Sequence, residues 1–413
     1  MKPKATIIFL LIILIFTTTC EKPERNNPWD KKAIPESWAP QNLQITNNSI
    51  RSITLTWQYN NTGEDGYKIE RKYEGENWAQ LASVTSNNYE DNNFNLNTQV
   101  YYRVCAYAGN YSSSWAENDF DATLPPPENL QITINSATSI TLTWNYNHAG
   151  HEGFKIDRKI NEGIWEEEFA TLNAGQANFS DDAVDLQYNT YSYRVYGFYQ
   201  SYQSNYTEQV MDFVCGYTLL IDNRDGNEYE TVQIGDQCWM KENLAYLPSV
   251  SDPVNGSETS SYYYVYGYEG ASVSEAKATA NYQTYGVLYN WPAALTACPQ
   301  GWHLPSDDEW TILTDYLGGG SVAGGKMKEA GTVRWDSPNT DATNSSSFSA
   351  LPGGYRDDNG RTYNSIGGTG VWWSSSEYST TNAWIRLMGC NFAFVYHDYS
   401  IKACGFSVRC LRD

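Results

Sequence analysis

The stretch ACPQGWHLPSDDEW at residues 297–310 predicts the clearest α-helix of this 413-residue sequence. Ser306 and Glu309 have the spacing of a capping box, which satisfies free backbone N–H groups at a helix start. Three apolar residues then recur with the helical period and predict a stripe that faces a core: Trp310, Leu313 and Leu317. The glycine run at 318–320 ends this helix.

Strand signals surround the helix on both sides. Residues 218–221 and 229–232 flank Asp225-Gly226, which predicts a hairpin turn. The same segment offers oxygen atoms to a calcium ion from Asp222, Asn223, Asp225 and Asn227. An EF-hand would also need flanking helices and a bidentate Glu late in the loop, so we expect the turn. Further strands are predicted at 383–387, 392–396 and 406–410.

Blocks of sequence in this region closely resemble the Fibrobacter succinogenes major paralogous domain. They are the stretch at 297–310, YETVQIGDQCWMKENL from Tyr229, YGVLYNWPAAL from Tyr285, FSALPGGYR from Phe348, VWWSSSE from Val371 and GFSVRCLRD from Gly405. The resemblance covers residues 215–413 and implies an architecture more than a chemistry. The GWHLP entry and the closing GF-x-x-RC segment are also similar to the C-type lectin-like fold and the related sulfatase-modifying factor group. This domain is therefore expected to be α+β.

Six of the eight cysteines fall in this domain, and six cysteines in an exported domain predict disulfides, although the sequence alone permits 15 pairings. The resemblance to C-type lectin-like folds implies a bond between Cys298 and Cys410. On that basis we expect two further pairs, Cys390 with Cys404 and Cys215 with Cys238. Cys105 lies outside the domain and is expected to be an unpaired thiol, with an intermolecular bridge as the alternative.

The N-terminus predicts export. Lys2 and Lys4 precede an apolar run at 7–16 that is too short to span a bilayer, which is typical of a signal peptide over residues 1–19. The run ends in TTTC, which resembles the lipobox of bacterial lipoproteins, although Thr17 replaces the usual Leu. The resemblance implies that Cys20 is diacylated, that residues 20–38 form a tether, and that the protein is held at the outer membrane or cell surface. The alternative is a plain signal peptide cleaved near residue 19.

Two copies of a repeat follow the tether. PQNLQIT from Pro40 recurs as PENLQIT from Pro127, and ITLTW ending at Trp57 recurs 87 residues later at Trp144. Apolar residues alternate within each copy, which is the period of a half-buried strand. This pattern resembles fibronectin type III domains and predicts two immunoglobulin-like β-sandwiches, at 39–124 and 125–213. The proline run between them favours a stiff connection and a rod.

Composition limits the function classes. The formal net charge of −21 repels phosphate backbones and anionic headgroups, so we expect no nucleic-acid partner and membrane contact only through the lipid anchor. The 33 Tyr and 15 Trp, against 18% charged residues, suit β-rich exported domains. The oligomeric state is left open.

The sequence gives little support for an enzyme. His148 and His151 lie in a polar loop without the partners of a zinc site, and no Gly-x-Ser-x-Gly elbow or nucleotide-cradling glycine motif occurs. Formylglycine-generating enzymes use a reactive cysteine pair upstream of their closing strand. Cys404 and Cys410 lie just before and inside that segment, so they do not reproduce the pattern. We expect no catalytic residues, no metal and no cofactor, with an enzyme related to the sulfatase-modifying factor group as an alternative.

A binding module is the expected function, for a carbohydrate or a protein. The candidate residues lie in one oxygen-rich loop and one tryptophan pair: Trp335, Asp336, Asn339, Asp341, Asn344, Trp372 and Trp373. The loop is either a calcium site or a polar surface. Neighbouring residues on a strand face opposite ways, so we expect one ring of the pair to point outward and bind ligand. The alternative without a ligand is a structural component of the cell envelope.

Overall fold

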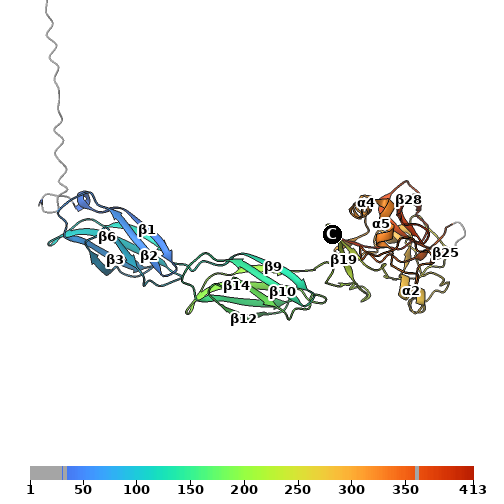
Figure 1. The fold of residues 1–413 in the computed structure, drawn as a ribbon, viewed down its shortest axis with the longest axis horizontal. Coiled ribbons are helices and arrows are strands. Elements are labelled where there is room, and N and C mark those ends of the chain that lie inside the picture. The colour runs from blue at the N-terminus through green and yellow to red at the C-terminus, as the bar shows by residue number, and fades with distance from the viewer. Residues whose placement is uncertain (1–29, 31–34, 359–361) are drawn as a thin grey trace, which may run out of the picture.

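The computed structural model describes residues 30, 35–358 and 362–413. The predicted signal peptide and Cys20 lie outside these residues. Figure 1 shows three bodies in a row, two elongated β-sandwiches followed by a domain with helices. None of the helices in the described part of the chain is long and apolar enough to cross a bilayer.

The first sandwich begins after the short 3-10 helix η1 (Pro35–Trp38). Its strands are β1 (Gln41–Ser49), β2 (Ser52–Gln58), β3 (Gly66–Tyr73), β4 (Ala79–Val84), β5 (Asn88–Asp91), β6 (Gln99–Ala108), β7 (Tyr111–Ser112) and β8 (Ala116–Asp121). One sheet has the order β1-β2-β5 and the other β4-β3-β6-β7, with β8 also paired to β6. The predicted alternation on β2 is present, because Ile53, Leu55 and Trp57 are all buried.

The second sandwich repeats this arrangement. Its strands are β9 (Glu128–Ser136), β10 (Ser139–Asn145), β11 (Gly153–Ile160), β12 (Trp165–Asn173), β13 (Asn178–Asp181), β14 (Tyr191–Tyr199), β15 (Tyr202–Gln203) and β16 (Thr207–Met211). The sheets have the orders β9-β10-β13 and β12-β11-β14-β15, with β16 paired to β14. Two antiparallel sheets facing each other across one core make both units immunoglobulin-like sandwiches.

The two sandwiches touch. The Ile50 N–H donates to the Ala149 carbonyl oxygen at 3.1 Å, and the Arg51 guanidinium lies 5.3 Å from the Tyr199 ring centroid. Tyr199 and Tyr202 of the second sandwich pack against the core of the first. The rod in Figure 1 is therefore continuous at this joint rather than two units separated by a spacer.

The C-terminal domain contains short helices and two larger sheets. Its elements are β17 (Leu220–Ile221), β18 (Glu228–Tyr229), β19 (Thr231–Ile234), β20 (Gln237–Met240), β21 (Tyr263–Tyr264), α1 (Val273–Lys277), α2 (Ala280–Tyr285), β22 (Leu288–Tyr289), α3 (Trp291–Ala294), β23 (Trp302–His303), α4 (Asp307–Tyr316), α5 (Gly320–Met327), β24 (Gly353–Arg356), β25 (Tyr363–Ile366), β26 (Thr369–Glu377), β27 (Asn382–Gly389), β28 (Tyr396–Ile401) and β29 (Leu411–Arg412). The sheets have the orders β19-β20-β29-β23 and β25-β24-β26-β27-β28.

Several predicted elements are present. Helix α4 begins at Asp307 with both halves of the Ser306–Glu309 capping box formed, and its predicted apolar stripe is buried. Strands β17 and β18 form the predicted hairpin around Gly226. The φ of Gly226 is 76°, which lies in the left-handed region that favours glycine. Asp222, one of the competing calcium ligands, is buried and pairs with Arg224 at 2.7 Å.

Two predicted strands are wrong. Residues 392–395 are not a strand, because their backbone bonds to helix α5 instead: the Gly325 N–H donates to the Ala393 carbonyl and the Val395 N–H to the Gly320 carbonyl, both at 2.8 Å. Strand β28 begins only at Tyr396. Residues 406–410 cross the core with isolated bridges, and regular pairing resumes at β29.

The disulfides follow two of the three expected pairings. Cys215 is bonded to Cys238, and Cys298 to Cys410. The expected pair of Cys390 and Cys404 is wrong, because both are free and buried. In the β27–β28 hairpin, Asn382 at the start of β27 pairs with Ile401 at the end of β28. Cys404 therefore lies near the start of β27, whereas Cys390 follows the end of that strand. Eight residues at about 3.3 Å each separate the two ends, whereas a disulfide requires Cα atoms roughly 4.4–6.8 Å apart.

Candidate binding surface

The two predicted tryptophans are not at the surface. Trp372 and Trp373 are both 0% exposed, which contradicts the expected outward ring. They do point to opposite faces of β26, as the strand period requires, but β26 is the central strand of its sheet and both faces are covered. Trp372 packs with Trp239, Trp310 and Phe348, and Trp373 with a second cluster.

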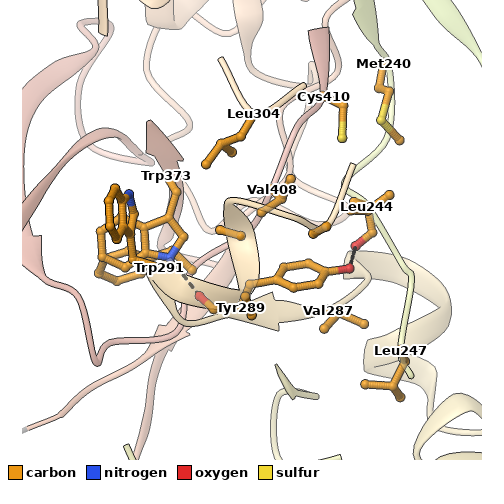
Figure 2. Packing of buried hydrophobic residues seen from close by; sticks show 14 of the residues in the cluster. Met240, Leu244, Leu247, Val287, Tyr289, Trp291, Leu304, Trp373, Val408 and Cys410 are labelled. Atoms are coloured by element: carbon orange, nitrogen blue, oxygen red, sulfur yellow. Dashed lines mark hydrogen bonds between the residues drawn. The ribbon is translucent and has the colours of Figure 1, made fainter. Parts of the chain in front are cut away.

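Figure 2 shows that second cluster from close by. The Trp373 indole N–H donates to the Tyr289 carbonyl at 2.7 Å, so the polar edge of the ring has a partner inside the core. On the other face, the Trp372 indole N–H donates to Asn243 Oδ1 at 2.9 Å. Both tryptophans are therefore core residues and not ligand contacts.

The predicted loop is also partly internal. Trp335 is buried, and its indole N–H donates to the Ala350 carbonyl at 3.0 Å. Asn339 is buried and donates to the Glu329 and Gly331 carbonyls, while Asn344 Oδ1 accepts from the Ser349 N–H. These side chains shape the loop, so Trp335, Asn339 and Asn344 are not free to contact a ligand.

Asp336 and Asp341, the two carboxylates of this loop, are exposed. Within the described ranges, no group of three or more His, Cys, Asp or Glu side chains has the arrangement of a metal site. The loop residues therefore offer a calcium ion two exposed carboxylates but no preformed cluster.

An aromatic surface that the sequence did not predict lies on strands β27 and β28 and on the connection between β26 and β27. We call the rings Tyr378, Trp384, His397 and Tyr399 the hairpin aromatic surface. Tyr378 and Tyr399 stack with centroids 3.9 Å apart and planes 4° apart, and Trp384 meets Tyr378 edge to face at 4.9 Å. His397 lies over Trp384 at 4.3 Å. Tyr378 and Tyr399 are each nearly half exposed.

Strand register places three of these rings on one face. Trp384 pairs with Tyr399 and Arg386 with His397, so these side chains project from the same side of the hairpin. Tyr378 joins them by stacking on Tyr399. Strand β28 is the edge of its sheet, which leaves the outer side of the surface open. Figure 1 places β28 away from β19, which marks the junction with the second sandwich.

Helix α4 supports one end of the surface. The buried Arg386 guanidinium donates to Asp307 Oδ1 at 2.6 Å, and His397 Nε2 lies 3.0 Å from the same oxygen. Arg386 also donates to the Thr311 hydroxyl at 3.1 Å. Because Arg386 ties the strand to the first turn of the helix, the His397 end of the surface has a fixed base.

Carboxylates flank the surface along the chain but project from the other face. Asp398 lies between His397 and Tyr399 on β28 and pairs with Ile385, so its side chain points away from the rings. Glu377 pairs with Lys402 at 2.7 Å. The flat rings can stack on apolar faces, and the tyrosine hydroxyls can exchange hydrogen bonds with hydroxyl groups of a ligand.

A histidine–carboxylate group lies elsewhere on the domain. His303 Nδ1 is 2.6 Å from Asp413 and Nε2 is 3.0 Å from Glu309, beside a cavity of about 640 Å³. The Ser306 hydroxyl donates to Glu309 at 2.8 Å. In an acyl-transfer triad the serine proton goes to the imidazole, whereas here it faces a carboxylate that caps a helix. The group therefore serves the start of α4.

Comparison with known proteins finds one family match and similar solved structures. Residues 232–412 match the Fibrobacter succinogenes major domain family. A two-domain fibronectin type III segment of chicken tenascin is similar at 11% identity and a TM-score of 0.27, over 42% of this chain and 99% of that one. The FN1–FN3 domains of chicken CNTN1 are similar at 17% identity and a TM-score of 0.20, over 42% of this chain and 64% of that one. None of the curated proteins matches the chain.

Proposed function

We propose a non-catalytic binding function, because residues 232–412 match the Fibrobacter succinogenes major domain family and follow two β-sandwiches, an architecture of surface and binding proteins. The protein is exported and held by a lipid on Cys20, and it binds a neutral carbohydrate through the hairpin aromatic surface. The observation that carries this proposal is the group of exposed rings on the β27–β28 edge.

The chemistry of the surface favours a sugar. The C–H face of a pyranose ring packs on an aromatic face, and the hydroxyls of Tyr378 and Tyr399 can exchange hydrogen bonds with the sugar hydroxyls. A net charge of −21 repels sulfated or phosphorylated glycans, which makes a neutral glycan the better ligand. A protein partner that used the same rings is the outcome that would replace the sugar.

Binding of the full-length mature chain to an array of neutral and anionic glycans tests the proposal. Trp384→Ala and Tyr399→Ala should each weaken binding of the retained glycan about tenfold, which is about 1.4 kcal/mol. Tyr188→Ala removes an equally exposed tyrosine from the second sandwich and should leave the affinity unchanged.

Three outcomes count against the proposal. Equal loss in the Tyr188→Ala control would show that the effect is not local to the hairpin. Retention of anionic glycans alone would contradict the electrostatic argument. A ligand recovered in cleaved or modified form would favour an enzyme.

A further inference from the structure

Lys328 is a buried cation that the binding surface does not use directly. It follows helix α5, and its residue is 0% exposed. Its ammonium donates to the carbonyl oxygens of Thr340, Gly389 and Phe392 at 3.0, 2.9 and 2.7 Å. An ammonium has three N–H donors, so these three acceptors satisfy it completely.

The three carbonyls come from separate segments. Thr340 lies in the oxygen-rich loop at 335–344, Gly389 ends strand β27, and Phe392 lies in the connection to β28. The Trp335 ring lies 5.5 Å from the ammonium and closes another side of the site. We call these three carbonyls and the ring the carbonyl cradle.

A bound calcium ion orders a protein loop by gathering oxygen atoms of the loop around a positive charge. Calcium takes about six to eight oxygen ligands at roughly 2.3–2.6 Å, and it is commonly held by carboxylates. The carbonyl cradle instead has three oxygens at hydrogen-bond distances, and the Lys328 ammonium supplies the positive charge between them. Burial lowers the pKa of Lys328, so the three hydrogen bonds hold the ammonium in place against a desolvation cost.

We infer that the Lys328 ammonium is a built-in cation that orders the 335–344 loop and the β27–β28 turn, and that the domain therefore binds its ligand without calcium. This inference rests on the proposed function for its second half. Gly389 and Phe392 bracket the turn between the two strands that carry Trp384 and Tyr399. Lys328 is thus a positioning residue for the hairpin aromatic surface.

The test is chemical rescue in the full chain. Lys328→Ala lacks three methylenes and the ammonium, which n-propylammonium restores. We expect the variant to lose protection of the 335–344 loop against proteolysis, by about tenfold in cleavage rate, and to lose a similar factor in glycan affinity. Propylammonium should restore both, whereas the neutral isostere n-propanol should restore neither.

Lys328→Met is the matched control. Its side chain fills the space of the lysine stem without a charge, so it should show the same loss and no rescue by propylammonium. For the wild type, neither calcium nor a chelator should change loop protection or affinity. If Lys328→Ala does not fold, its refolding yield with propylammonium against propanol gives the same comparison.

Each arm can overturn the inference. Unchanged protection in Lys328→Ala, rescue by propanol as good as by propylammonium, or a wild-type loop that calcium protects would each contradict it. Loop protection is measured without glycan. If the wild type binds no glycan but propylammonium still restores loop protection in Lys328→Ala, the proposed function is wrong and the built-in cation is retained.

Discussion

Burial decides the chemistry of the three free cysteines in the described residues. Cys105 is 0% exposed at the centre of β6, and burial raises the pKa of its thiol to about 11. Burial also raises the pKa of Cys404. Cys390 is 7% exposed. A thiol reacts as its thiolate and only where a reagent reaches it, so these cysteines should be inert in the native protein.

We therefore predict that a thiol reagent near pH 8 modifies none of Cys105, Cys390 and Cys404 in the native chain and all three after unfolding without reduction. Peptide mapping should recover Cys215 joined to Cys238 and Cys298 joined to Cys410. A Cys390–Cys404 peptide would show that the hairpin register is wrong. A dimer linked through Cys105 would contradict its burial.

The sequence predicts which face of a strand a side chain occupies, but it does not predict whether that face is exposed. The strand period sends Trp372 and Trp373 to opposite faces, and it does so in the structure. Exposure of either ring depends on which strand is central, which local sequence does not state. Trp384 and Tyr399 are 15 positions apart and become neighbours only through the β27–β28 register, so no local motif signals the hairpin aromatic surface.

Buried cations show the same limit. Arg409 is fully buried and donates to the carbonyls of Lys241 and Phe348 at 2.6 and 2.5 Å, and Arg356 donates to the Pro253 and Ala403 carbonyls. These arginine bonds join carbonyls that are far apart in the sequence. The segment before β29 bonds its own backbone to several partners in turn, with the Phe406 N–H donating to Tyr289 and the Ser407 N–H to Val371. It is therefore buried without forming the one continuous strand that its alternating sequence predicts.

At the scale of elements, helix α4 joins local and long-range structure. Its start was predictable because a capping box uses residues three positions apart. The start of the helix is also tied to two strands, because Arg386 of β27 contacts Asp307 and His303 of β23 contacts Glu309. Burial works against ionisation of Glu309, but hydrogen bonds from Ser306 and from His303 outweigh it and lower its pKa.

These hydrogen bonds predict that the domain loses stability as the pH falls. A carboxyl whose pKa is lower in the folded state contributes stability above its unfolded pKa, near 4.5, and loses it as the pH falls through the folded value. Glu309→Gln keeps an acceptor for the cap without titrating, so its stability should depend less on pH below about 4.5 than that of the wild type. Denaturant unfolding between pH 3 and pH 6, followed by tryptophan fluorescence, measures this.

Ser306→Ala is the control for the cap itself. It should cost about 1 kcal/mol at neutral pH, because it removes a hydrogen bond to a free backbone N–H. A Glu309→Gln protein with the same acid dependence as the wild type would assign the loss of stability at low pH to other carboxylates.

At the scale of the whole molecule, the described parts form one continuous rod. Beyond the contact between the sandwiches, the Leu219 N–H donates to the Gln187 carbonyl at 3.0 Å, and the Thr218 hydroxyl donates to the Leu186 carbonyl at 2.8 Å. Cys215 of the Cys215–Cys238 bond lies three residues before Thr218 of this second joint. Backbone bonds at both joints limit bending, so the two sandwiches carry the last domain away from η1.

The repeat made this organisation predictable, because two copies of one strand pattern imply two copies of one domain. Contacts at the joints were not predictable, since Arg51 and Tyr199 come from different copies and share no local motif.

The last prediction is that Cys20→Ala releases the protein from membranes and abolishes its labelling with palmitate. It follows from the charged start, the short apolar run and the cysteine at the end of TTTC. A single acyl chain gives only marginal binding, with an association constant of about 10⁴ M⁻¹, so the diacylated cysteine should supply the whole anchor. Cys105→Ala is the matched control, because it removes a buried cysteine and should leave labelling and membrane retention unchanged. Membrane retention of Cys20→Ala with normal labelling would mean that the lipid is elsewhere. Release of the wild type without label would mean a plain signal peptide and a protein that leaves the membrane after cleavage.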